Sequence, residues 1–349
     1  MYTAQSKKLL IMNILEILQQ YTDENHRLSQ REIGEILERE YNIRADRKTI
    51  KRNLTDLIEA GYDLEYSESI RKNRQGEEET LLTGWYLNRT FTDSELRLLI
   101  DGLLFSKHIP YSQCRDLVKK LEGLSSRYFL SRTGYIRTLS EDQPNNSQLF
   151  YTIEILDEAI RKKVQVAFQY LEYGTDKRLH LRRNQEGQVR EYIINPYQMA
   201  AVNGRYYLIC NYDKYDNVSN YRLDRITEIR LLDTPVKDRT KIRGLKQGLN
   251  LPRHMAEHIY MLAGESIPVT FRFEKLILND VMDWFSEIRF SNETKDTVEA
   301  AVTVNREAMI CWTMQYGRYV EVLTPLDLRE ELGQAFREAA ERYHNLTSG

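Results

Sequence analysis

The residues best suited to chemistry in this sequence are basic side chains gathered between positions 44 and 53. This interval holds five basic residues and one acid, whereas residues 54 to 68 hold five acids and no base. The basic residues open a predicted helix, where positive side chains oppose the helix dipole, so this placement favours a segment that binds an anion. Phosphate groups and base edges of DNA are the partners that we expect. The residues predicted to contact DNA are Arg44, Arg47, Lys48, Thr49, Lys51, Arg52 and Asn53.

The helix that must position these side chains is predicted over residues 46 to 61. Asp46 is a favourable N-cap, and Gly61 supplies the left-handed residue that ends many helices. An apolar stripe with helical spacing is predicted to be buried, and it consists of Ile50, Leu54, Leu57 and Ile58. The basic residues would then lie on the opposite face. The alternative is an ordinary solvated helix face, which most charge runs are.

The elements around this helix predict a winged helix-turn-helix over residues 1 to 90. Helices are predicted at 8–21 and 30–41, and strands at 63–66 and 80–87. Ser29 and Glu32 form a capping box at the start of the second helix. In a winged helix the third helix enters the major groove and the hairpin reaches the neighbouring backbone, so we expect phosphate contacts from Arg71, Lys72 and Arg74. A purely structural three-helix unit is the alternative.

The composition limits the class of protein. A chain of 349 residues is too long for one ordinary core, so two or three domains are expected. The net charge is −2, but residues 160 to 248 hold 18 basic and 10 acidic residues, a net charge of +8. Residues 249 to 349 hold 10 and 16, a net charge of −6. The basic middle segment favours an anionic partner.

Cysteine usage and hydropathy predict the compartment. Cys114, Cys210 and Cys311 are far apart and form no C-x-x-C pair, which argues against a disulfide framework and a zinc ribbon. No apolar run approaches membrane-spanning length, and Asn13 and Glu16 interrupt the N-terminal apolar segment. A soluble protein of the reducing cytoplasm, without a membrane partner, is therefore expected.

One motif suggests an enzyme. His254, Glu257 and His258 match H-x-x-E-H, a zinc peptidase pattern in which two histidines one helical turn apart bind the metal. Pro252 places this motif at the start of a short connector helix, and catalysis would need a third ligand from another helix. We favour two exposed helix histidines, and a zinc metallopeptidase is a remote alternative. There is no Walker loop or G-x-S-x-G motif, so neither a cofactor nor an enzyme activity is expected.

A helical region is predicted over residues 91 to 148. One helix follows a capping signal at Thr92 and Glu95, and a second is predicted at about 112 to 126. Both are strongly apolar on one side, which favours packing on a partner such as a second copy of the chain. Residues 131 to 148 are polar and rich in turn-forming residues, and they predict a linker.

The hydrophobic period changes in the next predicted domain, residues 149 to 235. A helix at 149–162 is followed by alternating apolar residues at Val164, Val166 and Phe168. Further strands are predicted at 191–199, 205–212 and 220–232. Short strands at this spacing predict a small antiparallel barrel or sandwich.

Residues 160 to 235 resemble a WYL domain, a family named for a Trp-Tyr-Leu tripeptide that here stands as Tyr206-Tyr207-Leu208. The other landmarks are Tyr170, Asn195-Pro196-Tyr197, Asn203-Gly204 and Tyr221-Arg222-Leu223-Asp224-Arg225-Ile226. A literal Trp85-Tyr86-Leu87 occurs in the second predicted wing strand. We interpret it as a coincidence, because nothing around it matches.

The resemblance implies an SH3-like barrel that senses a ligand, often proposed to be nucleic acid or a nucleotide, in a bacterial transcription regulator. Independently, the arginines and tyrosines interleaved here suit single-stranded nucleic acid, because bases stack on rings and guanidiniums follow phosphates. The residues predicted to bind this ligand are Tyr170, Arg182, Arg183, Tyr206, Tyr207, Arg222 and Arg225. The alternative is that the tyrosines fill a small barrel and the arginines are solvated.

The C-terminal part is predicted as a connector over residues 236 to 266 and a domain over residues 267 to 349. The order of elements expected in this domain is βαββαβ, which makes a ferredoxin-like fold. It resembles the C-terminal extension that commonly accompanies WYL domains.

Together these patterns predict an α+β multidomain, sequence-specific DNA-binding transcription regulator, expected to be a repressor. Its partners would be a double-stranded DNA operator, an anionic effector such as nucleic acid or a nucleotide, and a second copy of the chain. The alternative is a single-stranded nucleic-acid sensor or adaptor that regulates no promoter.

Overall fold

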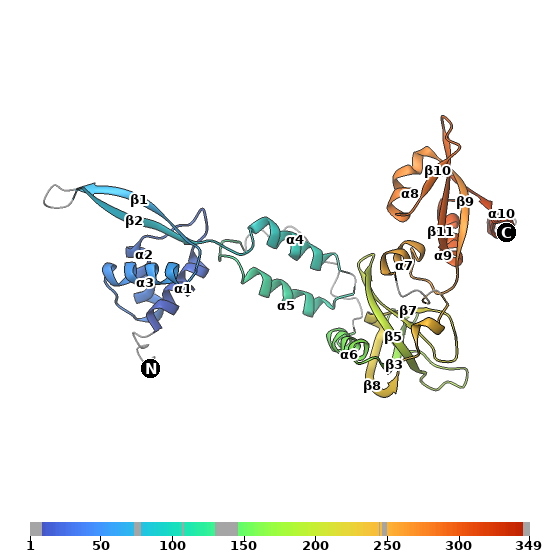
Figure 1. The fold of residues 1–349 in the computed structure, drawn as a ribbon, viewed down its shortest axis with the longest axis horizontal. Coiled ribbons are helices and arrows are strands. Elements are labelled where there is room, and N and C mark those ends of the chain that lie inside the picture. The colour runs from blue at the N-terminus through green and yellow to red at the C-terminus, as the bar shows by residue number, and fades with distance from the viewer. Residues whose placement is uncertain are drawn as a thin grey trace. The chain divides into compact units, whose positions relative to one another are not determined.

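The computed structural model describes residues 9–72, 78–106, 108–129, 146–243, 245 and 250–344. The chain is a mixed α+β protein with several separate sheets, as predicted, and it divides into two units, Met1–Gln143 and Pro144–Gly349 (Figure 1). Most of the linker predicted over 131 to 148 lies outside the described residues, and so does Arg74 of the predicted hairpin. None of the described helices is long and apolar enough to cross a bilayer.

Three short helices open the first unit, and their ends follow the predicted caps. They are α1 (Leu10–Tyr21), α2 (Gln30–Tyr41) and α3 (Arg47–Glu59). Ser29 and Glu32 form the predicted capping box of α2, and the Asp46 carboxylate accepts the Thr49 N–H at the start of α3. Gly61 follows α3 with a φ of +93°, a conformation that favours glycine.

A two-stranded antiparallel sheet follows, and the region 9–90 fits the predicted winged helix-turn-helix. Its strands, β1 (Leu64–Lys72) and β2 (Glu78–Leu87), are longer than predicted. Trp85 of the literal Trp-Tyr-Leu tripeptide is fully buried in the same core as the three helices, with the Tyr66 ring 4.7 Å from its own. Backbone hydrogen bonds between Trp85 and Leu28, of 2.8 and 2.9 Å, tie β2 to the segment before α2. This tripeptide therefore builds the core of the winged-helix region.

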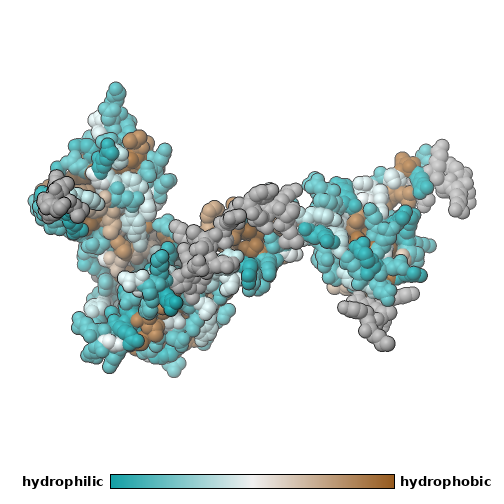
Figure 2. Space-filling model, turned by 180° about the vertical axis from the view of Figure 1, so that it is seen from behind, coloured by the Kyte–Doolittle hydropathy of each residue, from teal (hydrophilic) through white to brown (hydrophobic). Residues whose placement is uncertain are grey.

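Two further helices, α4 (Asp93–Leu104) and α5 (Tyr111–Glu122), complete the described part of the first unit. Thr92 and Glu95 form the expected capping box of α4. The two helices enclose a small cluster around Leu96, Ile100 and Phe129. Hydrophobic residues also lie on the surface of this region, as the brown areas in the middle of Figure 2 show.

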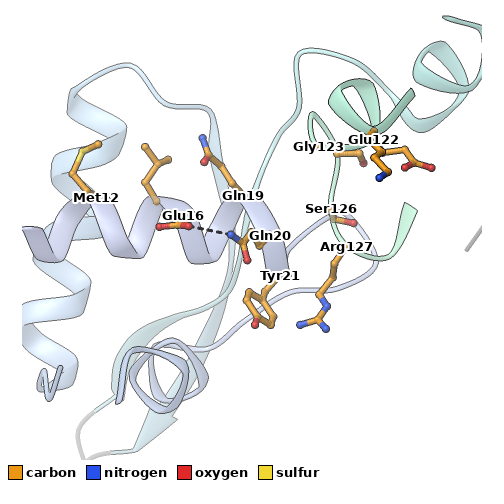
Figure 3. Close-up of a pocket in the computed structure, with 12 residues that line it drawn as sticks. Met12, Glu16, Gln19, Gln20, Tyr21, Glu122, Gly123, Ser126 and Arg127 are labelled. Atoms are coloured by element: carbon orange, nitrogen blue, oxygen red, sulfur yellow. Dashed lines mark hydrogen bonds between the residues drawn. The ribbon is translucent and has the colours of Figure 1, made fainter. Parts of the chain in front are cut away.

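The turn after α5, residues 125–129, holds the winged-helix region through several contacts, and we call it the junction turn. The Ser126 hydroxyl donates to an Asp23 carboxylate oxygen at 2.7 Å, and the Tyr128 ring stacks on the His26 ring with centroids 3.6 Å apart. Arg127 donates its N–H to the Gln20 carbonyl at 3.0 Å and lies 4.7 Å from the Tyr21 ring centroid. A groove of about 910 Å³ between α1 and α5 ends at these residues (Figure 3).

The second unit begins with α6 (Leu149–Lys162) and a six-stranded antiparallel sheet. The strands are β3 (Val164–Tyr173), β4 (Leu179–Leu181), β5 (Glu191–Val202), β6 (Arg205–Asn211), β7 (Ser219–Arg222) and β8 (Ile226–Pro235). Their order is β4-β3-β5-β6-β7, and β8, which lies off this path, pairs antiparallel with β3. The 3₁₀ helix η3 (Leu223–Arg225) joins β7 to β8. Aromatic rings fill the interior, where Phe168 stacks on Tyr192 at 5.5 Å.

A connector and a second sheet complete the chain. The connector carries η4 (Arg239–Lys241) and α7 (Leu251–Glu257). The remaining elements are β9 (Ser266–Glu274), η5 (Lys275–Ile277), α8 (Leu278–Trp284), β10 (Arg289–Ser291), β11 (Thr297–Asn305), α9 (Arg306–Tyr316), β12 (Val320–Thr324) and α10 (Leu326–His344). The strands are antiparallel in the order β10-β11-β9-β12, and the βαββαβ succession is the one expected from the sequence. Phe271 and Trp312 are fully buried in its core.

Candidate nucleic-acid interface and ligand site

The outward face of α3 carries four exposed basic side chains. They are Arg47, Lys48, Lys51 and Arg52. No ion pair involving them is found among the residues that the structure describes. Three other exposed arginines of the winged-helix region are paired, since Arg31 contacts Glu35, Arg39 contacts Glu40 and Arg44 contacts Glu38. The α3 face is therefore a local concentration of positive charge without internal neutralisation, which suits an anionic polymer.

The structure corrects the predicted faces of α3 at two residues. Asn53 was predicted to contact DNA, but it is 9% exposed and its Nδ2 donates to the Thr49 carbonyl at 2.8 Å. It stands three residues after Ile50 and four before Leu57, so it falls on the buried side of the helix. Ile58, predicted to be buried, is 38% exposed. Asn53 therefore leaves the set of candidate DNA contacts.

The other residues predicted to contact DNA differ in their surroundings. The Thr49 hydroxyl donates to the Asp46 carboxylate at 3.0 Å, so it belongs to the helix cap. Arg44 is exposed and its Nε donates to Glu38 at 2.7 Å, an ion pair that a phosphate could replace. Arg71 is exposed in β1, opposite Glu79 of β2. The side chain of Lys72, like all of Arg74, lies outside the described residues.

A cluster of two arginines and one carboxylate lies at β6, β7 and η3, and we call it the Asp224 cluster. Arg222 Nε donates to Asp224 Oδ1 at 3.0 Å, and its Nη2 donates to Oδ2. Arg205 Nη1 lies 3.9 Å from the same Oδ2. Tyr207 stands opposite Arg222 in the β6–β7 register. Two guanidiniums share one carboxylate, so the cluster keeps one unbalanced positive charge.

A second group surrounds Tyr170. The Tyr170 hydroxyl accepts the backbone N–H of Arg222 at 3.2 Å, which connects this group to the Asp224 cluster. The Arg182 guanidinium lies 5.8 Å from the Tyr170 ring centroid, and Arg182 Nε donates to Glu172 at 2.8 Å. The Arg225 guanidinium lies 5.5 Å from the Tyr173 ring. Burial of Tyr170 raises the pKa of its hydroxyl, so this side chain stays neutral beside the arginines.

The structure brings five of the seven predicted ligand residues into these two groups. They are Tyr170, Arg182, Tyr207, Arg222 and Arg225. Arg183 instead donates from Nη1 to the Gly187 carbonyl at 2.6 Å, in the turn before β5. Tyr206 points to the opposite face of β6 from Tyr207, because successive residues of a strand alternate. No described contact joins Arg183 to the Asp224 cluster.

Several other tyrosines fill the interior, as the alternative interpretation expected. Tyr192 is buried, its ring lies 5.5 Å from that of Tyr221, and the Tyr212 and Tyr221 hydroxyls are 2.9 Å apart. Tyr207 packs partly against Ala200 and Ile209. Tyr170 belongs to this interior as well, because it is 7% exposed and its ring lies 5.1 Å from that of Tyr221.

The prediction did not single out two residues of the Asp224 cluster, Arg205 and Asp224. Asp224 follows Arg222 by two residues, a spacing that allows an ion pair across a tight turn. This spacing was the one signal available in the sequence. Arg205 reaches the cluster through the pairing of β6 with β7, which local sequence does not reveal.

The Asn-Pro-Tyr landmark has a structural role. Asn195 is fully buried, and its Oδ1 accepts from Gln165 Nε2 at 3.0 Å and from the Lys237 N–H at 2.9 Å. The Tyr197 hydroxyl donates to the Lys237 carbonyl at 3.0 Å. These contacts fix the chain that leaves β8, because a buried amide without partners would be costly.

The H-x-x-E-H residues do not form the exposed helix histidines that we predicted. His254 and His258 are both buried, and their rings stack with centroids 4.1 Å apart. His258 Nδ1 lies 3.0 Å from the His254 carbonyl oxygen, and Glu257 accepts from Arg253 at 2.6 Å. Among the described residues, no group of three or more His, Cys, Asp or Glu could hold a metal ion. The motif reads as packing in the connector.

This histidine pair predicts a loss of stability in mild acid. Burial, with a smaller effect of His258, lowers the pKa of His254 to about 4, whereas an unfolded histidine titrates near ~6.5. Between these values only the unfolded state binds the proton, so the stabilisation is complete above about pH 6.5 and is lost as the pH falls. We expect a decrease of about 2 kcal/mol in the unfolding free energy between about pH 7 and pH 5.

Denaturant unfolding at several pH values measures this effect. His254→Phe keeps an aromatic ring in the stack and should reduce the pH dependence over this interval, with a remainder from His258, whose pKa burial also lowers. His180→Phe, at an exposed position, is the matched control and should retain it. An unchanged pH dependence in His254→Phe would contradict the assignment.

Comparison with known proteins identifies both parts of the second unit. Residues 151–231 match the WYL domain family, and residues 265–340 match the WCX domain family. No curated protein sequence matches the chain.

Two solved structures are similar to this chain at low sequence identity. Proteasome accessory factor B/C (PafBC) of Arthrobacter aurescens is 16% identical with a TM-score of 0.28. The match covers 92% of this chain and 47% of that one, so this chain spans about half its length. The crystal structure of a CRISPR Cas-related protein is 13% identical with a TM-score of 0.36, over 99% of this chain and 88% of that chain. From the family matches, the chain contains a WYL domain followed by a WCX domain.

Proposed function

We propose that this protein is a sequence-specific DNA-binding transcription regulator that acts as a repressor and whose WYL domain binds an anionic effector. The observation that carries the proposal is the α3 face, where Arg47, Lys48, Lys51 and Arg52 are exposed without an ion pair among the described residues. The helix belongs to a region that fits a winged helix-turn-helix. In that geometry the exposed start of the third helix meets base edges in the major groove.

The remaining contacts would position the protein on the duplex. Arg44 and Arg71 are exposed and suit phosphate contacts, which fix register without reading sequence. As a homodimer, the protein would present two α3 helices to a pseudo-palindromic operator, with half-sites about one helical turn or a multiple apart.

The effector site that we propose is the Asp224 cluster together with the Tyr170 group. We interpret the six-stranded sheet as an SH3-like barrel and the C-terminal sheet as a ferredoxin-like domain. The unbalanced positive charge at Arg205 and Arg222 suits a phosphate, and the nearby tyrosine rings suit a base. Nucleic acid or a nucleotide is therefore the effector class, and Asp224 occupies the position that its phosphate would take.

Selection of bound fragments from genomic DNA by the full chain tests the DNA-binding proposal. The expected result is an enriched pseudo-palindromic sequence whose affinity exceeds that for unrelated duplex by at least about a thousandfold. Binding of single strands with no preferred duplex sequence would instead support the sensor or adaptor that regulates no promoter.

The Asp224 cluster predicts opposite effects for two substitutions. Arg222→Ala should weaken the binding of a short labelled single-stranded oligonucleotide by about 1–3 kcal/mol, because a charged contact is removed. Asp224→Asn should strengthen it, because the carboxylate no longer competes for Arg205 and Arg222. Fluorescence anisotropy at fixed salt measures both. Arg183→Ala is the matched control and should leave the affinity unchanged, and equal weakening by all three variants would exclude this site.

A further inference from the structure

The side of α4 that faces away from its own core carries an apolar stripe. Leu96 and Ile100 are buried, whereas Leu98 between them is 74% exposed. One helical turn on either side of Leu98 stand Ser94 and Gly102, which fall on the same face as Leu98. Such a stripe on a short helix is typical of a surface that packs on another helix.

Residues of similar type stand at equal distances on the two sides of Leu98. Ser94 and Gly102 are each four residues from Leu98, and exposed phenylalanines, Phe91 and Phe105, are each seven residues from it. An antiparallel copy of α4 related by a two-fold axis at Leu98 would therefore set leucine against leucine and place Ser94 of one copy level with Gly102 of the other; Phe91 precedes the N-cap Thr92, so only Phe105 continues the helical spacing. Self-complementarity of this kind is what a two-fold symmetric interface requires.

No described neighbour of Gly102 requires a glycine at this position. A Cβ added at this position would meet nothing within 4 Å. Glycine weakens an exposed helix relative to alanine, so its presence in the third turn favours a close approach by another helix.

The charges beside the stripe are also complementary. Arg97 Nε donates to both carboxylate oxygens of Asp101, at 2.9 and 3.1 Å, so the two side chains lie along one edge of the stripe. In the antiparallel pair each Arg97 stands within two residue levels of Asp101 on the other copy. The order along the edge is then acid, base, base, acid, so each arginine stands two levels from a carboxylate of the other copy and two levels from its arginine.

We propose that α4 packs antiparallel against α4 of a second copy of this chain, around a two-fold axis at Leu98. The inference deepens the proposed homodimer and does not depend on DNA binding. One pair of 12-residue helices is smaller than a standard stable interface, so dissociation in roughly the micromolar range is expected for the free protein.

Disulfide cross-linking of the full chain tests the axis. In a Cys311→Ser background, which removes the exposed native thiol, Leu98→Cys should form a disulfide-linked dimer rapidly. Leu276→Cys, at a position 76% exposed in the second unit, is the matched control. A mixture of Ser94→Cys and Gly102→Cys chains should cross-link more than either chain alone. Cross-linking of Leu98→Cys no faster than the control would overturn the proposal.

Sedimentation velocity tests the α4 interface separately from dimerisation of the chain. Leu98→Glu should raise the dimer dissociation constant by about 100-fold, because two like charges would meet on the axis, and Leu276→Glu should not. Gly102→Leu should also weaken the dimer although it favours the helix. A dimer that survives both changes would rule out this surface but leave the proposed homodimer standing. A wild-type chain that stays monomeric at high concentration would overturn both the α4 interface and the proposed homodimer. It would favour the alternative that residues of the same chain pack on the stripe.

Discussion

Replacement of Arg47 and Arg52 together by alanine is expected to lower the affinity for the selected operator by roughly 2–6 kcal/mol at fixed salt. Each arginine that reads a base edge contributes about 1–3 kcal/mol. Both are exposed: Arg52 lies opposite the stripe of Ile50 and Leu54 that fixes the helix in its core, and Arg47 stands in the first turn of α3, before this stripe begins. The core residues are untouched, so the fold of the winged-helix region should not change.

Mobility-shift titration with operator and unrelated duplex measures the effect. Arg39→Ala is the matched control, because this arginine is in the same region but pairs with Glu40 at 3.1 Å at the end of α2. Loss of affinity for the operator should exceed the loss for unrelated duplex, since base contacts carry the sequence information. Equal losses on the two duplexes would mean that these side chains contact only phosphate, and unchanged binding would count against α3 as the recognition helix.

Replacement of Trp85 by alanine is expected to destabilise the first unit by about 3–5 kcal/mol, the usual cost of deleting a buried tryptophan. The side chain is 0% exposed and packs in the core of α1, α2 and α3. Because domain stability is commonly only ~5–15 kcal/mol, the variant should bind DNA poorly through partial unfolding.

The two units can be followed separately in this experiment. Trp284 and Trp312 are the remaining tryptophans and both lie in the second unit, so the fluorescence of the variant reports that unit alone. Far-UV circular dichroism should show an earlier first transition while the fluorescence transition stays in place. Ile70→Ala, at a position 72% exposed in β1, should shift neither. An unshifted first transition in Trp85→Ala would mean that this tripeptide does not support the winged-helix core.

Local signals in the sequence predicted the helices of the first unit well. The capping residues Ser29, Asp46 and Thr92 start α2, α3 and α4 where the sequence placed them, because a cap depends on residues three positions apart. Asn53 was misplaced because its residue type was weighted over its position, although the helical period already placed it beside Leu54 and Leu57. The helical period predicted the orientation of Asn53 better than its residue type did.

The ligand site was only partly predictable, because it depends on strand register. The Arg222–Tyr207 pair and the approach of Arg205 to Asp224 arise where β6 meets β7, between residues that are far apart in sequence. Burial of His254 and His258 had a similar cause. The helical spacing of the pair was clear, but the packing of the connector that encloses both rings was not.

Under the proposed DNA-binding function, the junction turn has a consequence for the spacing of half-sites. Ser126, Arg127 and Tyr128 hold the end of α1 and the Asp23–His26 turn, and α1 shares a core with α3. The winged-helix region is thus held to the turn after α5 by several contacts rather than by a single flexible point. In the proposed homodimer, the protein would then fix the distance between the two winged-helix regions. Operators whose spacer has a different length would bind weakly even when both half-sites match the preferred sequence.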